Sequence, residues 1–165
     1  MEQLTIRRAE PADVPALAAL EALCFPAAEA ATEASLCERV LTYGNHFYLL
    51  FADETLVSFV DGLCTDQPDL TDDLFADAAL HDEAGAWQML FGVNTHPSYR
   101  KKGYAGRLIR AMIADAESQG RAGLVLTCKE ALVHWYASFG FVSEGLSVSQ
   151  HGGAVWYQMR IRFRK

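Results

Sequence analysis

A basic loop with two glycines opens directly into a helix and carries the clearest chemical signal in this sequence. Its residues are Arg100, Lys101, Lys102, Gly103, Tyr104, Ala105 and Gly106. The first backbone N–H groups of a helix have no acceptor within the helix, and the positive end of the helix dipole lies at the same place. With three cationic side chains beside them, these donors favour an anion. The sequence therefore predicts a phosphate or pyrophosphate site here.

A buried strand and an amphipathic helix must hold this loop. Residues 89–93 are apolar, and the helix after the loop repeats its apolar residues at i, i+3, i+4, i+7, i+8 and i+11. This spacing places one face against a core. The apolar positions are Ala105, Leu108, Ile109, Met112, Ile113 and Ala116. Two common nucleotide motifs do not fit, because no Lys-Ser/Thr follows Gly106 and the loop lacks the G-x-G-x-x-G spacing.

Length and composition predict one compact domain over residues 1–165. The chain is 51% hydrophobic, which suffices for a sizeable core. It has no apolar run of membrane-spanning length and no signal segment, so we expect a cytoplasmic protein without membrane contact. The four cysteines are scattered, which is typical of reduced thiols, and the five histidines form no ligand motif, so no metal is expected.

The charge is unevenly distributed. Between Arg39 and Arg100 there are ten Asp or Glu and no Lys or Arg, whereas residues 100–165 contain eleven Lys or Arg and four acids. The basic half suits an anionic ligand and the acidic half a cationic one. Nucleic acid is not expected as a partner, because no aromatic residues alternate with the basic ones and the net charge is −7.

Hydrophobic periodicity predicts a mixed α/β sandwich with a central, mostly antiparallel sheet. Strands are expected at 4–9, 46–52, 56–62, 87–95, 123–127, 141–150 and 154–163, and helices at 11–23, 35–41, 105–116 and 130–139, with helical turns near 72–80. Strands 87–95 and 123–127 should be parallel, because one helix connects them. The order is β-α-α-β-β-β-α-β-α-β-β.

The loop also carries a family signature. Arg100–Ala105 has the pattern Arg-x-x-Gly-x-Ala, preceded by His-Pro-Ser-Tyr at 96–99, and it resembles the acetyl-CoA motif of the GNAT N-acetyltransferase superfamily. Residues 135–141, WYASFGF, resemble the Y-x-x-x-GF signature of that superfamily. Residues 21–32 and 128–136 resemble the arylalkylamine (serotonin) N-acetyltransferases. The resemblance spans nearly the whole chain and implies the GNAT fold.

The resemblance implies an enzyme that moves an acetyl group from acetyl-CoA to the primary amine of a small apolar or aromatic molecule by direct attack. The CoA pyrophosphate would lie on the amides of residues 101–106 beside Arg100. The acetyl and pantetheine arm would follow the strand edge at Val93, Asn94 and Thr95. Tyr136, at the family's tyrosine position, would be the general acid.

One departure leaves the proton acceptor open. The vertebrate arylalkylamine enzymes carry two histidines on the strand before the loop, and this chain has Met89 and Phe91 there, which cannot carry a proton. The base could be Glu29 or His134, or a chain of water molecules could replace it. The amine pocket would be lined by four apolar residues: Phe25, Pro26, Met89 and Phe91.

Two alternative functions remain open at this stage. The chain could acetylate another amine, such as a polyamine, an amino-acid derivative, an aminoglycoside or a peptide N-terminus. It could also be a non-catalytic acyl-CoA sensor, since the histidines are missing. A monomer or a homodimer is expected.

Overall fold

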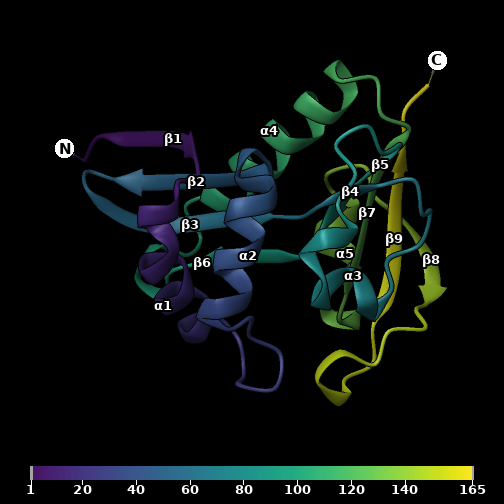
Figure 1. Cartoon of the computed structure of the whole chain (residues 1–165), viewed down its shortest axis with the longest axis horizontal. Coiled ribbons are helices and arrows are strands. Elements are labelled where there is room, and N and C mark those ends of the chain that lie inside the picture. Colours follow the sequence, from purple (N-terminus) through teal and green to yellow (C-terminus); the bar gives the residue numbers. More distant parts are fainter. Residues whose placement is uncertain (1, 165) are drawn as a thin grey trace. The chain divides into compact units, whose positions relative to one another are not determined.

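In the computed structural model, which describes residues 2–164, the chain forms two compact units, each built on its own β-sheet (Figure 1). The first unit comprises the residues up to Asp61 together with Gly92–Met112. The second comprises Gly62–Phe91 together with the residues from Ile113 onward. The chain passes between the units in two extended segments and once within a helix.

The first unit has a four-stranded antiparallel sheet in the order β1-β2-β3-β6. Its elements are β1 (Leu4–Arg8), α1 (Val14–Cys24), α2 (Glu33–Tyr43), β2 (Phe47–Ala52), β3 (Thr55–Asp61), β6 (Gly92–Thr95) and the first half of α4 (Tyr104–Ser118). Helices α1 and α2 pack on each other, and α1 also packs on β3 and β6 (Figure 1). The fully buried side chains include Leu17, Leu36, Phe47 and Phe59. The core of this unit therefore lies between the helix pair and the sheet.

The second unit has a five-stranded sheet in the order β4-β5-β7-β9-β8. Its elements are β4 (Cys64–Thr65), α3 (Asp72–Ala76), β5 (Trp87–Leu90), the second half of α4, β7 (Gly123–Cys128), α5 (Val133–Ala137), β8 (Val142–Leu146) and β9 (Tyr157–Arg162). Strands β5 and β7 are parallel and the other pairs are antiparallel. The predicted parallel crossover is thus confirmed. The predicted apolar stripe of α4 is also confirmed, because four of its side chains are at most 1% exposed: Leu108, Ile109, Met112 and Ala116.

The strand predicted over residues 87–95 is instead two strands, divided at Phe91. Its first part pairs in parallel with β7, and its second part pairs antiparallel with β3. One extended segment therefore serves two sheets, and the backbone changes partner at residue 91. Periodicity could not show this division, because both parts are extended and only their partner strands differ.

Three element boundaries also differ from the prediction. Helix α2 begins at Glu33 rather than Ser35, because the Thr32 hydroxyl caps it by accepting the Ser35 N–H at 3.1 Å. The helix expected over 130–139 is a 3₁₀ turn, Glu130–Leu132, followed by the short α5, and Gly140 ends it with a φ of 103°. The last hairpin has shorter strands and a longer connection at 147–156.

Within residues 2–164, no helix is both long and apolar enough to cross a bilayer. The single domain expected over residues 1–165 remains a prediction.

We expect Gly123→Ala to lower the free energy of unfolding by at least about 2 kcal/mol. A Cβ at this position of β7 would lie 1.8 Å from the carbonyl oxygen of Ile161 on β9, so the two strands would have to separate. Urea denaturation measures the change. Gly145→Ala is the matched control, because nothing lies within 4 Å of its added Cβ and its φ of 88° costs about 1 kcal/mol. Equal losses in the two variants would contradict the steric explanation.

Candidate active site

The predicted anion loop has a backbone that turns its amides outward. Lys101 and Gly103 have positive φ angles of 65° and 78°, and α4 begins at the next residue, Tyr104. The Arg107 N–H donates to the Gly103 carbonyl at 3.1 Å, so the amides just before Arg107 lie outside the helix ladder. A Cβ on Gly103 would meet nothing within 4 Å. The loop is therefore an open cradle of backbone donors, as an anion site requires.

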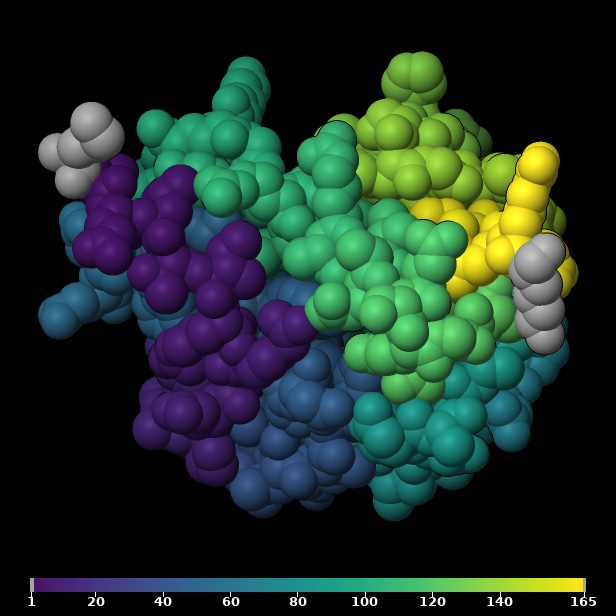
Figure 2. Space-filling model, turned by 90° about the horizontal axis from the view of Figure 1, so that it is seen from above, coloured from purple at the N-terminus to yellow at the C-terminus, as the bar shows by residue number. Residues whose placement is uncertain are grey.

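Cationic side chains surround this cradle. Arg100, Lys101, Lys102 and Arg107 are exposed, and Figure 2 shows the face on which the green segment containing α4 is open to solvent. The Arg100 Nε donates to the Thr95 carbonyl at 3.2 Å, which ties the loop to the end of β6. The positive charge is thus held beside the strand that leads into the loop.

Strand β6 offers one edge for an extended ligand. It is the last strand of its sheet and pairs only with β3 among the described strands. The His96 N–H donates to the Val57 carbonyl at 2.8 Å, so by antiparallel alternation the amides of Asn94 and Gly92 also face β3. The amides of Val93 and Thr95 then face the other edge. The Thr95 carbonyl fits this pattern, since it accepts the Arg100 Nε and, at 3.3 Å, the Cys24 thiol.

The predicted residues around the end of α1 lie in the same unit as the loop. Phe25 is half-buried and ends the helix, and Pro26 is exposed. Glu29 is half-buried, and its N–H donates to the Pro26 carbonyl at 2.8 Å in the turn after the helix. Their predicted roles in lining a pocket and taking a proton remain predictions.

Tyr136, Met89 and Phe91 belong to the second unit. Tyr136 is 6% exposed on α5, with its ring centroid 4.9 Å from that of Trp135 and 6.0 Å from that of Phe141. Burial raises the pKa of its phenol, so the side chain keeps its proton at neutral pH. Met89 is fully buried within β5, whereas His134 is exposed on α5.

An aromatic row extends from Phe91, and the sequence did not indicate it. The Phe75 ring lies 4.5 Å from that of Phe91 and 4.9 Å from that of His151, which in turn lies 6.0 Å from that of Trp156. All four side chains are half-buried. They come from α3, the end of β5, the connection 147–156 and its junction with β9. No local pattern could join segments so far apart in the chain.

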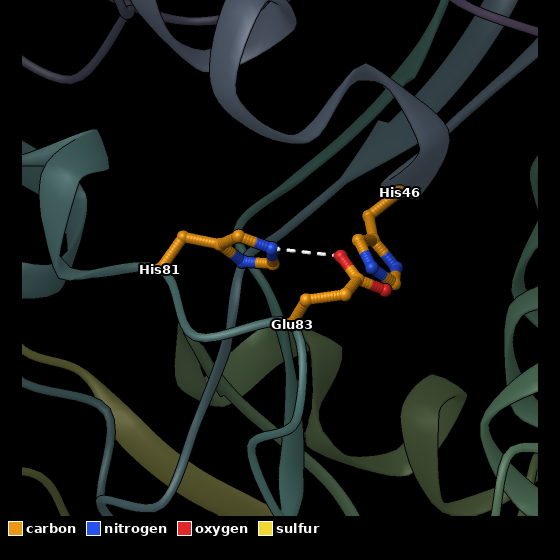
Figure 3. A group of neighbouring side chains, drawn as sticks. All are labelled: His46, His81 and Glu83. Carbon is orange, nitrogen blue, oxygen red and sulfur yellow. Dashed lines mark hydrogen bonds and ion pairs between the residues drawn. The ribbon is translucent and has the colours of Figure 1, made fainter.

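Hydrogen bonds and ion pairs hold the acidic connection before β5 in place. The His81 Nδ1 accepts the Cys64 N–H at 3.0 Å, so the ring proton lies on Nε2, 2.9 Å from a Glu83 carboxylate oxygen (Figure 3). Asp69 pairs with Arg160 at 3.0 Å, and Asp72 accepts the Gln150 N–H at 3.0 Å. These carboxylates stabilise the second unit by pairing within it. Less negative charge therefore remains unpaired to attract a cationic ligand.

A second unpredicted group of polar residues lies within the first unit. Glu21, Arg39, Asp61 and Asn94 come from α1, α2, β3 and β6, and each is at most 5% exposed. One signal was present in the sequence, because Glu21 falls on the apolar stripe of its helix and Asp61 ends an apolar strand. Charges at such positions indicate a buried polar cluster.

Comparison with known proteins identifies the family. The family model described as "Acetyltransferase (GNAT) domain" matches residues 43–143, more than half of the chain. The chain belongs to the GNAT acetyltransferase family. The predicted fold class is thereby confirmed.

Solved structures share this GNAT fold over almost their full length. The loading GNATL domain of CurA from Lyngbya majuscula is 18% identical with a TM-score of 0.83, covering 97% of this chain and 98% of that one. The GphF GNAT-like decarboxylase in complex with isobutyryl-CoA is 23% identical with a TM-score of 0.82, covering 97% and 100%. The ribosomal-protein-S18-alanine N-acetyltransferase from Escherichia coli is 18% identical with a TM-score of 0.72, covering 99% and 96%. At these identities the likeness concerns the fold.

Proposed function

We propose that this GNAT protein transfers an acetyl group from acetyl-CoA to the primary amine of a small molecule with an apolar or aromatic body. The observation that carries the proposal is the basic loop at 100–106, with its outward amides, next to the outer edge of β6. An anion cradle beside an unpaired strand edge suits a ligand with a pyrophosphate at one end and an amide-rich arm at the other.

The donors of the first unit suit acetyl-CoA in two places. Arg100, Lys101 and Lys102 would hold the pyrophosphate together with the amides of residues 101–106. The amide-rich arm would pair with the outer edge of β6 as an added strand. The outward Val93 N–H would then polarise the acetyl carbonyl, which is the role of an oxyanion donor.

The aromatic row supports the proposed amine class. Phe91, Phe75, His151 and Trp156 pack against one another and are half-buried, so their exposed parts would offer apolar contact to an apolar or aromatic group. Amine substrates without an apolar body, such as polyamines and aminoglycosides, would gain little binding free energy from these rings. The arylalkylamine branch is therefore our preferred assignment.

In the proposed transfer the amine nitrogen attacks the acetyl carbon with its lone pair, a C–N bond forms, and the C–S bond breaks. The nitrogen loses a proton and the sulfur gains one. The raised pKa of Tyr136 makes its phenol a weak acid, so it would stabilise the departing sulfur by donating a hydrogen bond while charge develops, and solvent would supply the final proton.

A second candidate is decarboxylation of a carboxylated acyl-CoA. The likeness to the GphF GNAT-like decarboxylase favours it, as does the pair Met89 and Phe91, which cannot accept a proton from an amine. In that reaction the C–C bond to the carboxylate breaks, CO₂ leaves, and a proton replaces it on carbon. The outward amide of Val93 would stabilise the enolate oxygen.

Release of CoA thiol from acetyl-CoA over an amine panel tests the proposal. The panel contains tryptamine, phenethylamine, spermidine and a lysine peptide. We expect turnover that favours the two arylalkylamines. Turnover of spermidine or the peptide alone would refute the amine class. CO₂ release from malonyl-CoA without amine turnover would favour the decarboxylase, and acetyl-CoA binding without any turnover would favour a sensor.

Removing the charge of the loop should weaken CoA binding. We expect the double variant Lys101→Ala/Lys102→Ala to raise the Kd for CoA about tenfold, or ~1.4 kcal/mol. The effect should shrink at high salt, because these cations are exposed. Isothermal titration at two salt concentrations measures it. Arg164→Ala removes an exposed charge far along the chain and should leave the Kd for CoA unchanged. An equal rise of Kd in Arg164→Ala and in the double variant would contradict CoA binding at this loop.

Tyr136→Phe should lower kcat about 100-fold and leave the Kd for acetyl-CoA unchanged, since the phenol would act on the sulfur only as the C–S bond breaks. Steady-state kinetics and titration give the two values. Tyr157→Phe removes another phenol of the second unit, one whose hydroxyl donates to Glu130 at 2.9 Å, and should behave like the wild type. An unaltered kcat in Tyr136→Phe would exclude the phenol from the reaction.

A further inference from the structure

Two carboxyl groups and one guanidinium are buried together in the first unit. The Arg39 Nη1 donates to Asp61 Oδ2 at 3.1 Å, and both residues are at most 5% exposed. Glu21 is also 5% exposed, and its Oε2 accepts the Ala31 N–H at 2.9 Å. The group therefore joins α1, α2 and β3 beneath the sheet, and Glu21 also fastens the turn after α1.

The same group converges on Gly92, the first residue of β6. A Cβ built on Gly92 would lie 3.2 Å from Asp61 Oδ1, 3.2 Å from Asn94 Nδ2 and 3.5 Å from Glu21 Oε1. The absence of a side chain on Gly92 lets these polar atoms approach the strand backbone. The next residue is Val93, whose N–H faces the outer edge where the acetyl carbonyl would lie. The carboxyl groups are thus one residue away from the proposed reaction centre.

Asn94 adds an independent sign that the cluster serves a ligand or a proton. Its side chain is completely buried, and its amide lies beside the Glu21 carboxyl group, where it helps to lower a Glu21 pKa that burial raises. Within residues 2–164 its Oδ1 has no hydrogen-bond partner, and a buried amide oxygen without one costs free energy. That oxygen is positioned to accept a hydrogen bond from an incoming group.

The charges of the cluster do not balance when both carboxyls are ionised. The Arg39 guanidinium, which stays protonated, pairs with Asp61 and also attracts Glu21, so one positive charge faces two carboxyl groups. Burial raises the pKa of Glu21, the Ala31 N–H opposes the rise, and the negative Asp61 adds to it. The titratable and charged groups around Glu21 are Asp61 from β3, Arg39 and Tyr43 from α2, and Cys24 on its own helix.

We propose that Glu21 accepts the amine proton during acetyl transfer, with Asp61, Arg39 and Asn94 as the residues that position it. The proposal rests on the proposed function. It names a proton acceptor, a role that neither Met89 nor Phe91 can fill. As the nitrogen lone pair forms the C–N bond, the N–H bond breaks and its proton passes to the Glu21 carboxylate. The neutral acid later releases the proton to solvent. Its raised pKa makes this carboxylate a stronger base than an ordinary glutamate.

Glu21→Gln tests this assignment and keeps the fold intact, because the Gln carbonyl can still accept the Ala31 N–H. We expect kcat to fall about 100-fold with an unchanged Kd for acetyl-CoA, and the acidic limb of the kcat/KM profile to disappear. Glu38→Gln, an exposed position on α2, is the matched control and should behave like the wild type. Loss of activity in Glu29→Gln instead, with Glu21→Gln fully active, would overturn the proposal.

Asp61→Asn gives a readout that a purely structural role would not change. It removes the negative neighbour of Glu21 and leaves the Arg39 charge uncompensated, so the acidic limb should move to lower pH. If kcat/KM falls by the same factor at every pH and the acidic limb does not move, Asp61 does not influence the protonation of Glu21, and the proposal is contradicted.

Stability against pH tests the protonation of Glu21 without any amine. Because folding raises the pKa of Glu21, its favourable contribution is complete below the ordinary glutamate pKa and is lost as pH rises through the folded value. The urea midpoint of Glu21→Gln should therefore rise relative to the wild type as pH increases, and a constant difference would overturn the proposal. Wild-type protein without amine turnover overturns the proposed function as well, whereas turnover retained in Glu21→Gln overturns only the role of Glu21.

Discussion

One extended segment has to supply strands to two different sheets. Residues 87–90 complete a parallel pair with β7, and residues 92–95 complete an antiparallel pair with β3. Strand β5 uses both of its hydrogen-bonding edges, one for β4 and one for β7. The pairing with β7 ends at Leu90, and β6 pairs only with β3 among the described strands. Strand β6 is therefore the end of its sheet, which makes the outer amides of Val93 and Thr95 available to a ligand.

The loop after β6 depends on the same arrangement. Arg100 is fastened to the Thr95 carbonyl, and the positive φ angles of Lys101 and Gly103 start the helix with its amides facing outward. The buried stripe of α4 then fixes the helix direction. Strand edge and amide cradle are therefore two parts of one continuous stretch of backbone, held by the core of the first unit.

The sequence predicted what is encoded locally. The amphipathic helix and the parallel crossover were confirmed because hydrophobic spacing acts over a few residues. The anion site at the loop remains a prediction. The division at Phe91 was missed, because it is a change of partner strand, which the pattern along one segment does not report. The aromatic row and the cluster at Gly92 were missed for a related reason: Phe75 and His151 are far apart in the chain, as are Glu21 and Asn94. Only the tertiary fold brings such residues together.

The buried cluster at Gly92 has a consequence for protein engineering. A carboxyl group without a compensating charge lowers stability above its folded pKa, and neutral residues at such positions usually raise it. Screening random variants for heat resistance alone would therefore enrich substitutions at Glu21. Under the proposed role of Glu21, selection for heat resistance and selection for turnover would favour different residues at this position.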